Sequence, residues 1–177
     1  MKDTLVVNLF GAPGAGKSTT AAGVFADLKD RGICCELVTE YAKDCTWEGR
    51  HETLSNQLYV FGKQHHRINR LLGKTSVIIT DSPLLLSLHY GSENTSETFK
   101  ALVKEEAEKL NSLNFFITRV KKYNPNGRNQ TEGESDVIAD KLLNMLKYEC
   151  PVFEKINGNL AGRDLIVRAA LAYSRGV

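Results

Sequence analysis

Glycines, a lysine and two hydroxyl-bearing residues follow one another at a fixed spacing near the start of the chain. Residues 11–18 read GAPGAGKS, which fits the pattern G-x-x-x-x-G-K-[ST]. Glycine lets a backbone curl closely around an anion, so this pattern is typical of a loop that holds a triphosphate. We expect Lys17 to reach the β- and γ-phosphates, Ser18 to ligate Mg²⁺ and Thr19 to contact the α-phosphate. The residues expected to bind ATP are Gly11, Ala12, Pro13, Gly14, Ala15, Gly16, Lys17, Ser18 and Thr19.

Two carboxylates stand directly after apolar runs of strand length. Asp81 follows residues 77–80 (VIIT), which is the setting of a Walker B aspartate that holds Mg²⁺ directly or through water. Glu40 follows residues 33–39, and a carboxylate there can accept the proton of an attacking hydroxyl. Each has a plainer alternative, in which Asp81 caps the next helix and Glu40 pairs with Lys43 in solvent.

A loop rich in turn-forming residues covers about 119–135 (RVKKYNPNGRNQTEGES). Its first part carries Arg119 and Arg128 and no acid, so we expect it to bring positive charge to the transferring phosphoryl group and to exclude water, as a lid does. Arg119 is counted with the acceptor-binding residues and Arg128 with the catalytic ones. The alternative is a solvated basic loop.

The acceptor side is less sharply marked. Gln57 and Gln64 share one flank of a helix expected over residues 50–72, where their amides could read the edge of a ring. Tyr41, with Trp47, could stack on a base, and Lys43 lies beside them. The same helix region carries a basic stripe that either tracks a nucleic-acid backbone or is simply solvated, namely Lys63, Arg67, Arg70 and Lys74.

These residues need a sheet whose strands all end at one edge. Extended and helical patterns alternate along the chain, which predicts an α/β fold with a five-stranded parallel sheet and a helical layer on each face. Leu58 and Val137 are expected to point into the core. The expected strands are 4–10, 33–39, 75–80, 113–118 and 151–156, and the expected helices 18–28, 50–72, 84–90, 97–110, 134–148 and 160–173.

The composition is that of an ordinary globular domain. The chain has 177 residues, 42% of them hydrophobic, a net charge of +2 and four cysteines without metal-ligand spacing. We expect one domain over residues 1–177, with free thiols in a reducing cytoplasm. We expect no membrane partner, because no apolar run approaches about 20 residues. The N-terminus shows no signal-peptide pattern. The oligomeric state stays open, a homodimer included.

The motifs together resemble a known family. The segments GAPGAGKST, TEYAKD, ITDSPL and YNPNGRNQTEGES, with the two glutamines, are similar to those of P-loop nucleoside and nucleotide kinases. The pattern is similar to nicotinamide riboside kinase-like domains and more so to phage kinases, themselves like thymidylate kinases, that act on 5-hydroxymethyluracil in DNA. That resemblance implies a three-layer P-loop kinase fold with a lid, ATP and Mg²⁺ as cofactors, and a location in the host cytoplasm if the chain is viral.

Three functions remain open at this stage. The first is a kinase that phosphorylates the hydroxymethyl group of 5-hydroxymethyluracil in DNA, a step in phage thymidine hypermodification. The second keeps the chemistry but takes a free small molecule, such as nicotinamide riboside, a nucleoside or a nucleoside monophosphate. The third is a regulatory NTPase, which the lid-like loop and the missing N/T-K-x-D guanine reader disfavour.

Overall fold

The computed structural model describes residues 4–91, 95–126, 130–150 and 152–175. Its strands are β1 (Leu5–Phe10), β2 (Cys35–Val38), β3 (Val77–Thr80), β4 (Ser112–Thr118) and β5 (Glu154–Asn157). Its helices are α1 (Lys17–Asp30), α2 (Tyr41–Trp47), α3 (His51–Ser55), α4 (Gln57–Asn69), α5 (Leu86–Tyr90), α6 (Glu97–Glu108), α7 (Glu132–Glu149) and α8 (Leu160–Arg175). Within these ranges no helix has the length and apolar character that crossing a membrane requires.

The five strands form one parallel sheet in the order β2-β3-β1-β4-β5, which confirms the predicted fold class. The chain builds β2 and β3 on one side of β1 and then crosses to add β4 and β5 on the other. The carboxyl end of β1 is therefore the switch point at which open α/β sheets bind ligands.

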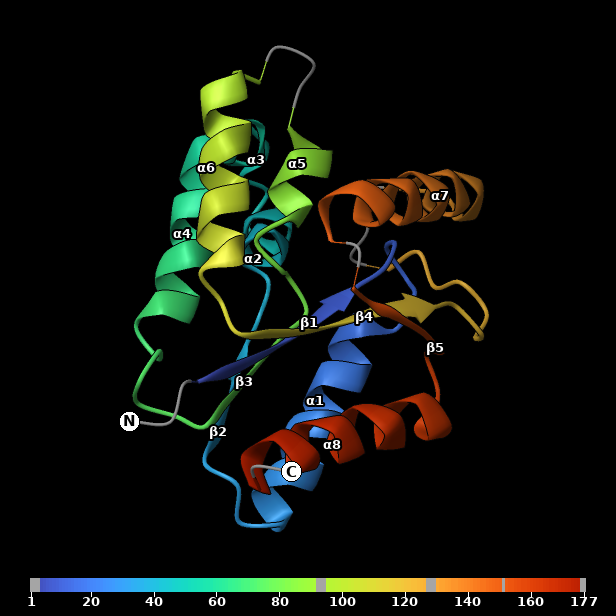
Figure 1. Cartoon of the computed structure of the whole chain (residues 1–177). Helices are drawn as coiled ribbons and strands as arrows, with labels where there is room; N and C mark the ends of the chain where they lie inside the picture. The colour runs from blue at the N-terminus through green and yellow to red at the C-terminus, as the bar shows by residue number, and fades with distance from the viewer. Residues whose placement is uncertain (1–3, 92–94, 127–129, 151, 176–177) are drawn as a thin grey trace.

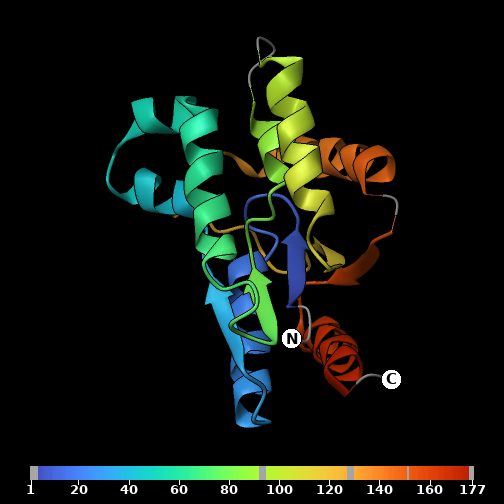
Figure 2. The same ribbon diagram turned by 60° about the vertical axis from the view of Figure 1, so that its left-hand side comes forward.

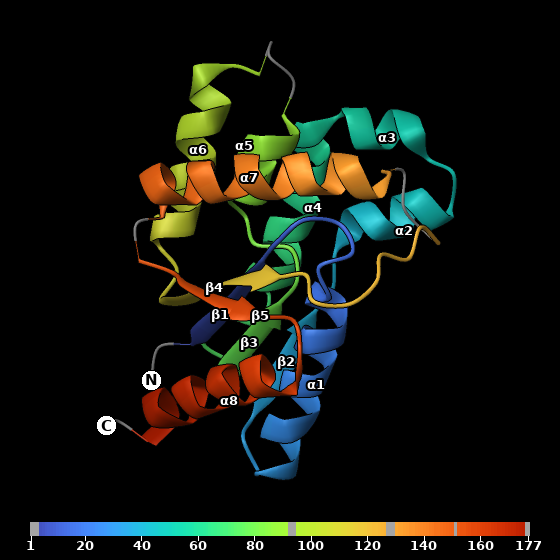
Figure 3. The same ribbon diagram turned by 90° about the vertical axis from the view of Figure 1, so that its right-hand side faces the viewer.

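Alternate residues of β1 face two separate cores. Leu5, Val7 and Leu9 pack against α1 and α8, whereas Val6 and Phe10 pack against α4 to α7. Figures 1 and 3 show these two helical layers on opposite faces of the sheet, with α2 and α3 beside α4 and beyond the end of the strands. All six β1 side chains are buried, as a central parallel strand requires.

Two helix expectations were wrong in detail. The helix expected over residues 50–72 is two helices, because the chain turns at Asn56, whose side chain accepts the amide hydrogen of Tyr59 and caps α4. Leu58 lies in the first turn of α4, outside the reach of the core, and is 63% exposed. Val137 is 54% exposed, because the inward face of α7 runs through Ser135, Ile138 and Leu142.

Candidate functional site

The loop between β1 and α1 is shaped around its glycines. Gly11, Gly14 and Gly16 have φ angles of 146°, 81° and 99°, which other residues adopt only under strain. A Cβ on Gly11 would also lie 2.8 Å from the carbonyl oxygen of Ile117. Lys17 Nζ donates to the carbonyl oxygen of Gly11 at 2.7 Å, so the ammonium group is already held over the loop. Such a loop at a helix N-terminus presents backbone N–H groups and a positive dipole end to an anion.

Two contacts from distant parts of the chain hold this loop, and no local sequence pattern predicts either of them. Ser135, 1% exposed in the first turns of α7, donates its hydroxyl to the carbonyl oxygen of Pro13 at 2.6 Å. Gly158, just after β5, packs so closely that a Cβ would lie 2.5 Å from the carbonyl oxygen of Ala15. The loop is therefore braced by α7 on one side and by the β5–α8 connection on the other.

A cavity of about 570 Å³ opens beside the loop. The phosphate loop and the start of α1 form one wall, α2 to α5 form the opposite wall, and Asn126 and Gln130 line it from the segment before α7. The side chains that α2 to α5 contribute are about half apolar or aromatic and half polar, and Trp47 among them is 67% exposed. The lining residues used below are Lys17, Ser18, Glu40, Lys43, Trp47, Leu54, Gln57, Val60, Gln64, Leu86 and Tyr90.

Glu40 lies on this cavity, between its two walls. It is the N-cap residue of α2, with φ −66° and ψ 121°, yet its carboxyl makes no capping bond to the described backbone of that helix. Burial raises the pKa of Glu40 above its ordinary value, Lys17 opposes the rise and the charge of Asp81 adds to it. A carboxylate of raised pKa at the edge of a phosphate site is suited to accept a proton from a hydroxyl.

Asp81 follows β3 and is 3% exposed. Its Oδ1 atom finds no hydrogen-bond partner within the described part of the chain, and an orphaned buried oxygen of this kind suits a cation. The described residues hold no cluster of three or more His, Cys, Asp or Glu side chains. Mg²⁺ does not need one, because it binds one or two protein groups together with substrate phosphates and water. Asp81 and the Ser18 hydroxyl thus fit the predicted ion.

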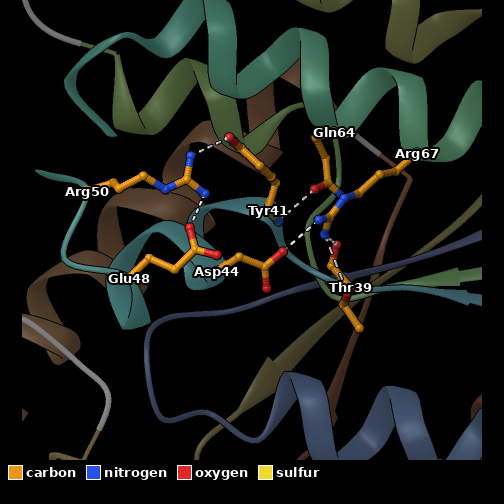
Figure 4. Close-up of polar contacts among 7 residues, drawn as sticks. All are labelled: Thr39, Tyr41, Asp44, Glu48, Arg50, Gln64 and Arg67. Atoms are coloured by element: carbon orange, nitrogen blue, oxygen red, sulfur yellow. Dashed lines mark hydrogen bonds and ion pairs between the residues drawn. The ribbon is translucent and has the colours of Figure 1, made fainter. Parts of the chain in front are cut away.

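Two side chains of α4 hold the backbone around Glu40. Gln64 accepts the amide hydrogen of Tyr41 through Oε1 at 3.0 Å, and Arg67 donates to the carbonyl oxygen of Thr39 at 3.0 Å and to Asp44 at 2.6 Å (Figure 4). The predicted role of Gln64 as a reader of a substrate ring does not fit this arrangement, since Nε2 also faces Thr80 Oγ1 at 3.5 Å. Arg67 is likewise engaged within the fold and does not form a free basic stripe.

The remaining predicted acceptor residues divide into two groups. Lys43 and Gln57 line the cavity, and Gln57 uses one amide hydrogen on the carbonyl oxygen of Leu54 at 2.7 Å. Tyr41 does not line it: its ring packs against Tyr59, with centroids 6.0 Å apart, and its hydroxyl meets Arg50.

Of the two predicted arginines of the lid, Arg119 is not among the described residues that line the cavity. Arg119 pairs with Glu132 at 2.8 Å and with Asp136, both on α7, and its guanidinium lies 5.3 Å from the ring centroid of Tyr123. It therefore fastens the segment to α7 instead of facing the phosphates. Arg128 lies outside the described residues.

Tyr90 is a cavity residue that the sequence did not single out. Burial and the nearby charge of Glu40 both raise the pKa of Tyr90, so its hydroxyl keeps its proton. Tyr90 belongs to the site because it lies near Glu40, which is 50 residues earlier in the chain. No sequence pattern predicts that proximity.

Comparison with known proteins gives a family and a fold. A family model described as "AAA domain" matches residues 6–163. Among 166 matching chains of solved structures is one described as "Crystal structure of NadR protein in complex with NR", with a TM-score of 0.70 and 16% sequence identity. The match covers 98% of this chain and 52% of that one, so this chain spans about half the length of its structural neighbour. No curated protein matched the sequence.

Proposed function

This chain belongs to the AAA domain family, and we propose that it is an ATP-dependent kinase that phosphorylates a hydroxyl group of a small molecule. The observation that carries the proposal is Glu40, a carboxylate without a capping role that lies on the cavity between the phosphate loop and the α2–α5 wall. A triphosphate-binding loop alone would serve any NTPase, whereas a carboxylate on a cavity that extends from the loop to the α2–α5 wall leaves room for an acceptor beside the triphosphate.

In the proposed reaction the residues divide the work by position. The loop from Gly11 to Thr19 binds the triphosphate, and Ser18 and Asp81 hold Mg²⁺, which would neutralise phosphate charge. Glu40 accepts the proton of the acceptor hydroxyl. The oxygen of that hydroxyl forms a bond to the γ-phosphorus, and the bond from the γ-phosphorus to the oxygen that leaves with ADP breaks.

The charges around the cavity favour an acceptor that carries no phosphate. Of the described residues that line it, Lys17 and Lys43 are the cationic ones, and Lys17 belongs to the triphosphate. An acceptor phosphate is ordinarily gripped by arginine forks, but Arg67 is committed to Thr39 and Asp44. Trp47, Leu54 and the other apolar wall residues suit a flat ring, and the NadR structure that shares this fold was solved with NR.

The hydroxymethyluracil reading has less support. A DNA substrate calls for a basic path to the cavity, yet Arg67 is used within the fold and Lys63 lies over the ring of Tyr59 at 5.3 Å. We therefore prefer the small-molecule acceptor and keep modified DNA as one arm of the test.

An acceptor panel with labelled ATP tests the proposal. It contains nucleosides, nicotinamide riboside, nucleoside monophosphates and DNA with 5-hydroxymethyluracil. We expect label on a non-phosphorylated nucleoside-like alcohol, and a loss of about 10²–10⁴ in kcat for Glu40→Gln. Preference for a monophosphate or for DNA would overturn the acceptor class. Steady ATP hydrolysis that no acceptor alters would identify a regulatory NTPase.

A further inference from the structure

The backbone on both sides of Glu40 is held by one neighbouring helix. Arg67 donates to the carbonyl oxygen of Thr39 through Nη1 at 3.0 Å, and Gln64 accepts from the amide of Tyr41 at 3.0 Å. These two side chains, three residues apart on α4, are called the α4 clamp here. The peptide groups before and after Glu40 are therefore both hydrogen-bonded to α4, and its side chain keeps its torsional freedom.

The clamp also satisfies a backbone donor at the start of α2. The first amide hydrogens of a helix have no partner within it, and an N-cap side chain usually accepts that of the second or third helical residue. Glu40, the N-cap of α2, makes no such bond to the described backbone. The amide hydrogen of Tyr41, the first residue of α2, is accepted by Gln64, which is 4% exposed. The start of α2 is therefore tied to α4, while the carboxylate of Glu40 is not held on its own helix.

Gln64 also contacts the residue that precedes the second carboxylate. Its Nε2 lies 3.5 Å from Thr80 Oγ1, which also accepts the amide hydrogen of Ser82 at 3.1 Å. Thr80 is 0% exposed and immediately precedes Asp81. One amide thus joins the residue after Glu40 to the residue before Asp81.

Arg67 fixes the rest of the first turn of α2. Its Nη2 meets Asp44 at 2.6 Å, and its guanidinium lies 5.2 Å from the ring centroid of Tyr41. Three groups of the α2 region therefore share one guanidinium, whose planar fork sets their relative directions. Figure 4 shows Gln64 and Arg67 reaching from α4 toward this turn together.

We propose that Gln64 and Arg67 are positioning residues that set the direction of the Glu40 carboxylate relative to Asp81. The inference rests on the proposed function, since it matters for catalysis only if Glu40 receives the proton. A misplacement of about 1 Å at a reacting group can cost on the order of a hundredfold in rate. The clamp therefore acts on the chemical step and not on the binding of ATP, whose loop it does not touch.

A double-mutant cycle tests the clamp, with Arg70→Met as the matched control, because Arg70 is an exposed arginine at the end of the same helix. We expect Arg67→Met and Gln64→Met each to lower kcat by about ten- to a hundredfold with the KM for ATP unchanged. Combined with Glu40→Gln, either change should cost less than about threefold more, because its effect passes through Glu40. Arg67→Lys, which keeps the charge at Asp44 but not the fork, should lie between wild type and Arg67→Met.

Several results would overturn the clamp. Three results would show that Gln64 and Arg67 contribute only to the stability of the fold. They are an equal loss of kcat with and without Glu40→Gln, an equal loss in Arg70→Met, and a parallel rise in the KM for ATP. If Glu40→Gln itself leaves kcat unchanged, the proposed function fails instead. Hydrogen exchange then still decides the clamp: Gln64→Met should speed exchange at the amide of Tyr41, and unchanged exchange there refutes it.

Discussion

The hydroxyl of Ser135 joins α7 to the phosphate loop, and its removal is a sharp test of that coupling. Ser135→Ala deletes a 2.6 Å bond to the carbonyl oxygen of Pro13 at a residue that is 1% exposed. A hydrogen bond of this kind contributes about 0.5–1.5 kcal/mol net. In a domain of this size that loss lowers Tm by roughly 1–6 °C. If all of it falls on the ordered loop, ATP affinity drops by about two- to thirteenfold.

The control for this experiment lies on the same helix. Thr131 caps α7 in a reciprocal pair with Glu134, and Thr131→Ala should cost about 1 kcal/mol of stability without touching the loop. Differential scanning calorimetry gives the stability of both variants, and isothermal titration with a non-hydrolysable ATP analogue gives the affinity. We expect similar losses of Tm and a loss of affinity in Ser135→Ala alone.

Two outcomes would refute the reasoning. If Thr131→Ala weakens nucleotide binding as much as Ser135→Ala does, the loop responds to the stability of α7 as a whole and not to one bond. If neither variant changes affinity, the loop is held by Gly158 and its own glycines, and the contact with Pro13 is structural only.

Further expectations follow from single residues. Glu40→Gln should raise the free energy of unfolding at neutral pH by about 0.5–2 kcal/mol. Burial raises the pKa of Glu40 above 4.5, so the stability of the wild type falls as pH rises from 4.5 through that raised pKa. Thermal melts between about pH 4 and pH 8 should show this contribution to the slope only in the wild type. Gly158→Ala should cost about 1–3 kcal/mol in urea unfolding and weaken nucleotide binding, because its Cβ would lie 2.5 Å from the carbonyl oxygen of Ala15. Asp81→Asn should remove about ten- to a hundredfold of the affinity for Mg²⁺ with bound nucleotide, measured by titrating the ion. Leu142→Ala, at a fully buried position, should cost about 2–5 kcal/mol in the same unfolding assay, whereas Tyr148→Ala, 85% exposed, should stay within about 0.5 kcal/mol.

The sequence was most informative where one local pattern determines the geometry. The phosphate loop combines strand, glycines and helix in one short segment, and the alternation of patterns was enough to predict the parallel sheet. The ends of β2 and β3 then indicated Glu40 and Asp81 as neighbours. These are consequences of backbone chemistry and strand direction, which a single sequence carries.

The parts that could not be predicted depend on which side chains meet across the fold. Nothing near Gln64 in the sequence indicates that its side-chain oxygen accepts the amide hydrogen of Tyr41. Nothing near Ser135 points to Pro13, 122 residues away. The exposure of Leu58 has the same origin, because its helix extends past the sheet, where helical spacing alone cannot say that the core has ended. Figure 2 shows how far α2 and α3, with the start of α4, stand out from the strands.

The rim of the cavity also provides a built-in optical reporter. The chain has a single tryptophan, Trp47, and it lines the cavity while two thirds of its side chain faces solvent. Its indole emission therefore arises from one known place and depends on how much water surrounds it. A ring that settles against α2 would shift that emission to shorter wavelength, so stopped-flow fluorescence of the unlabelled protein can follow occupancy of this cavity in time.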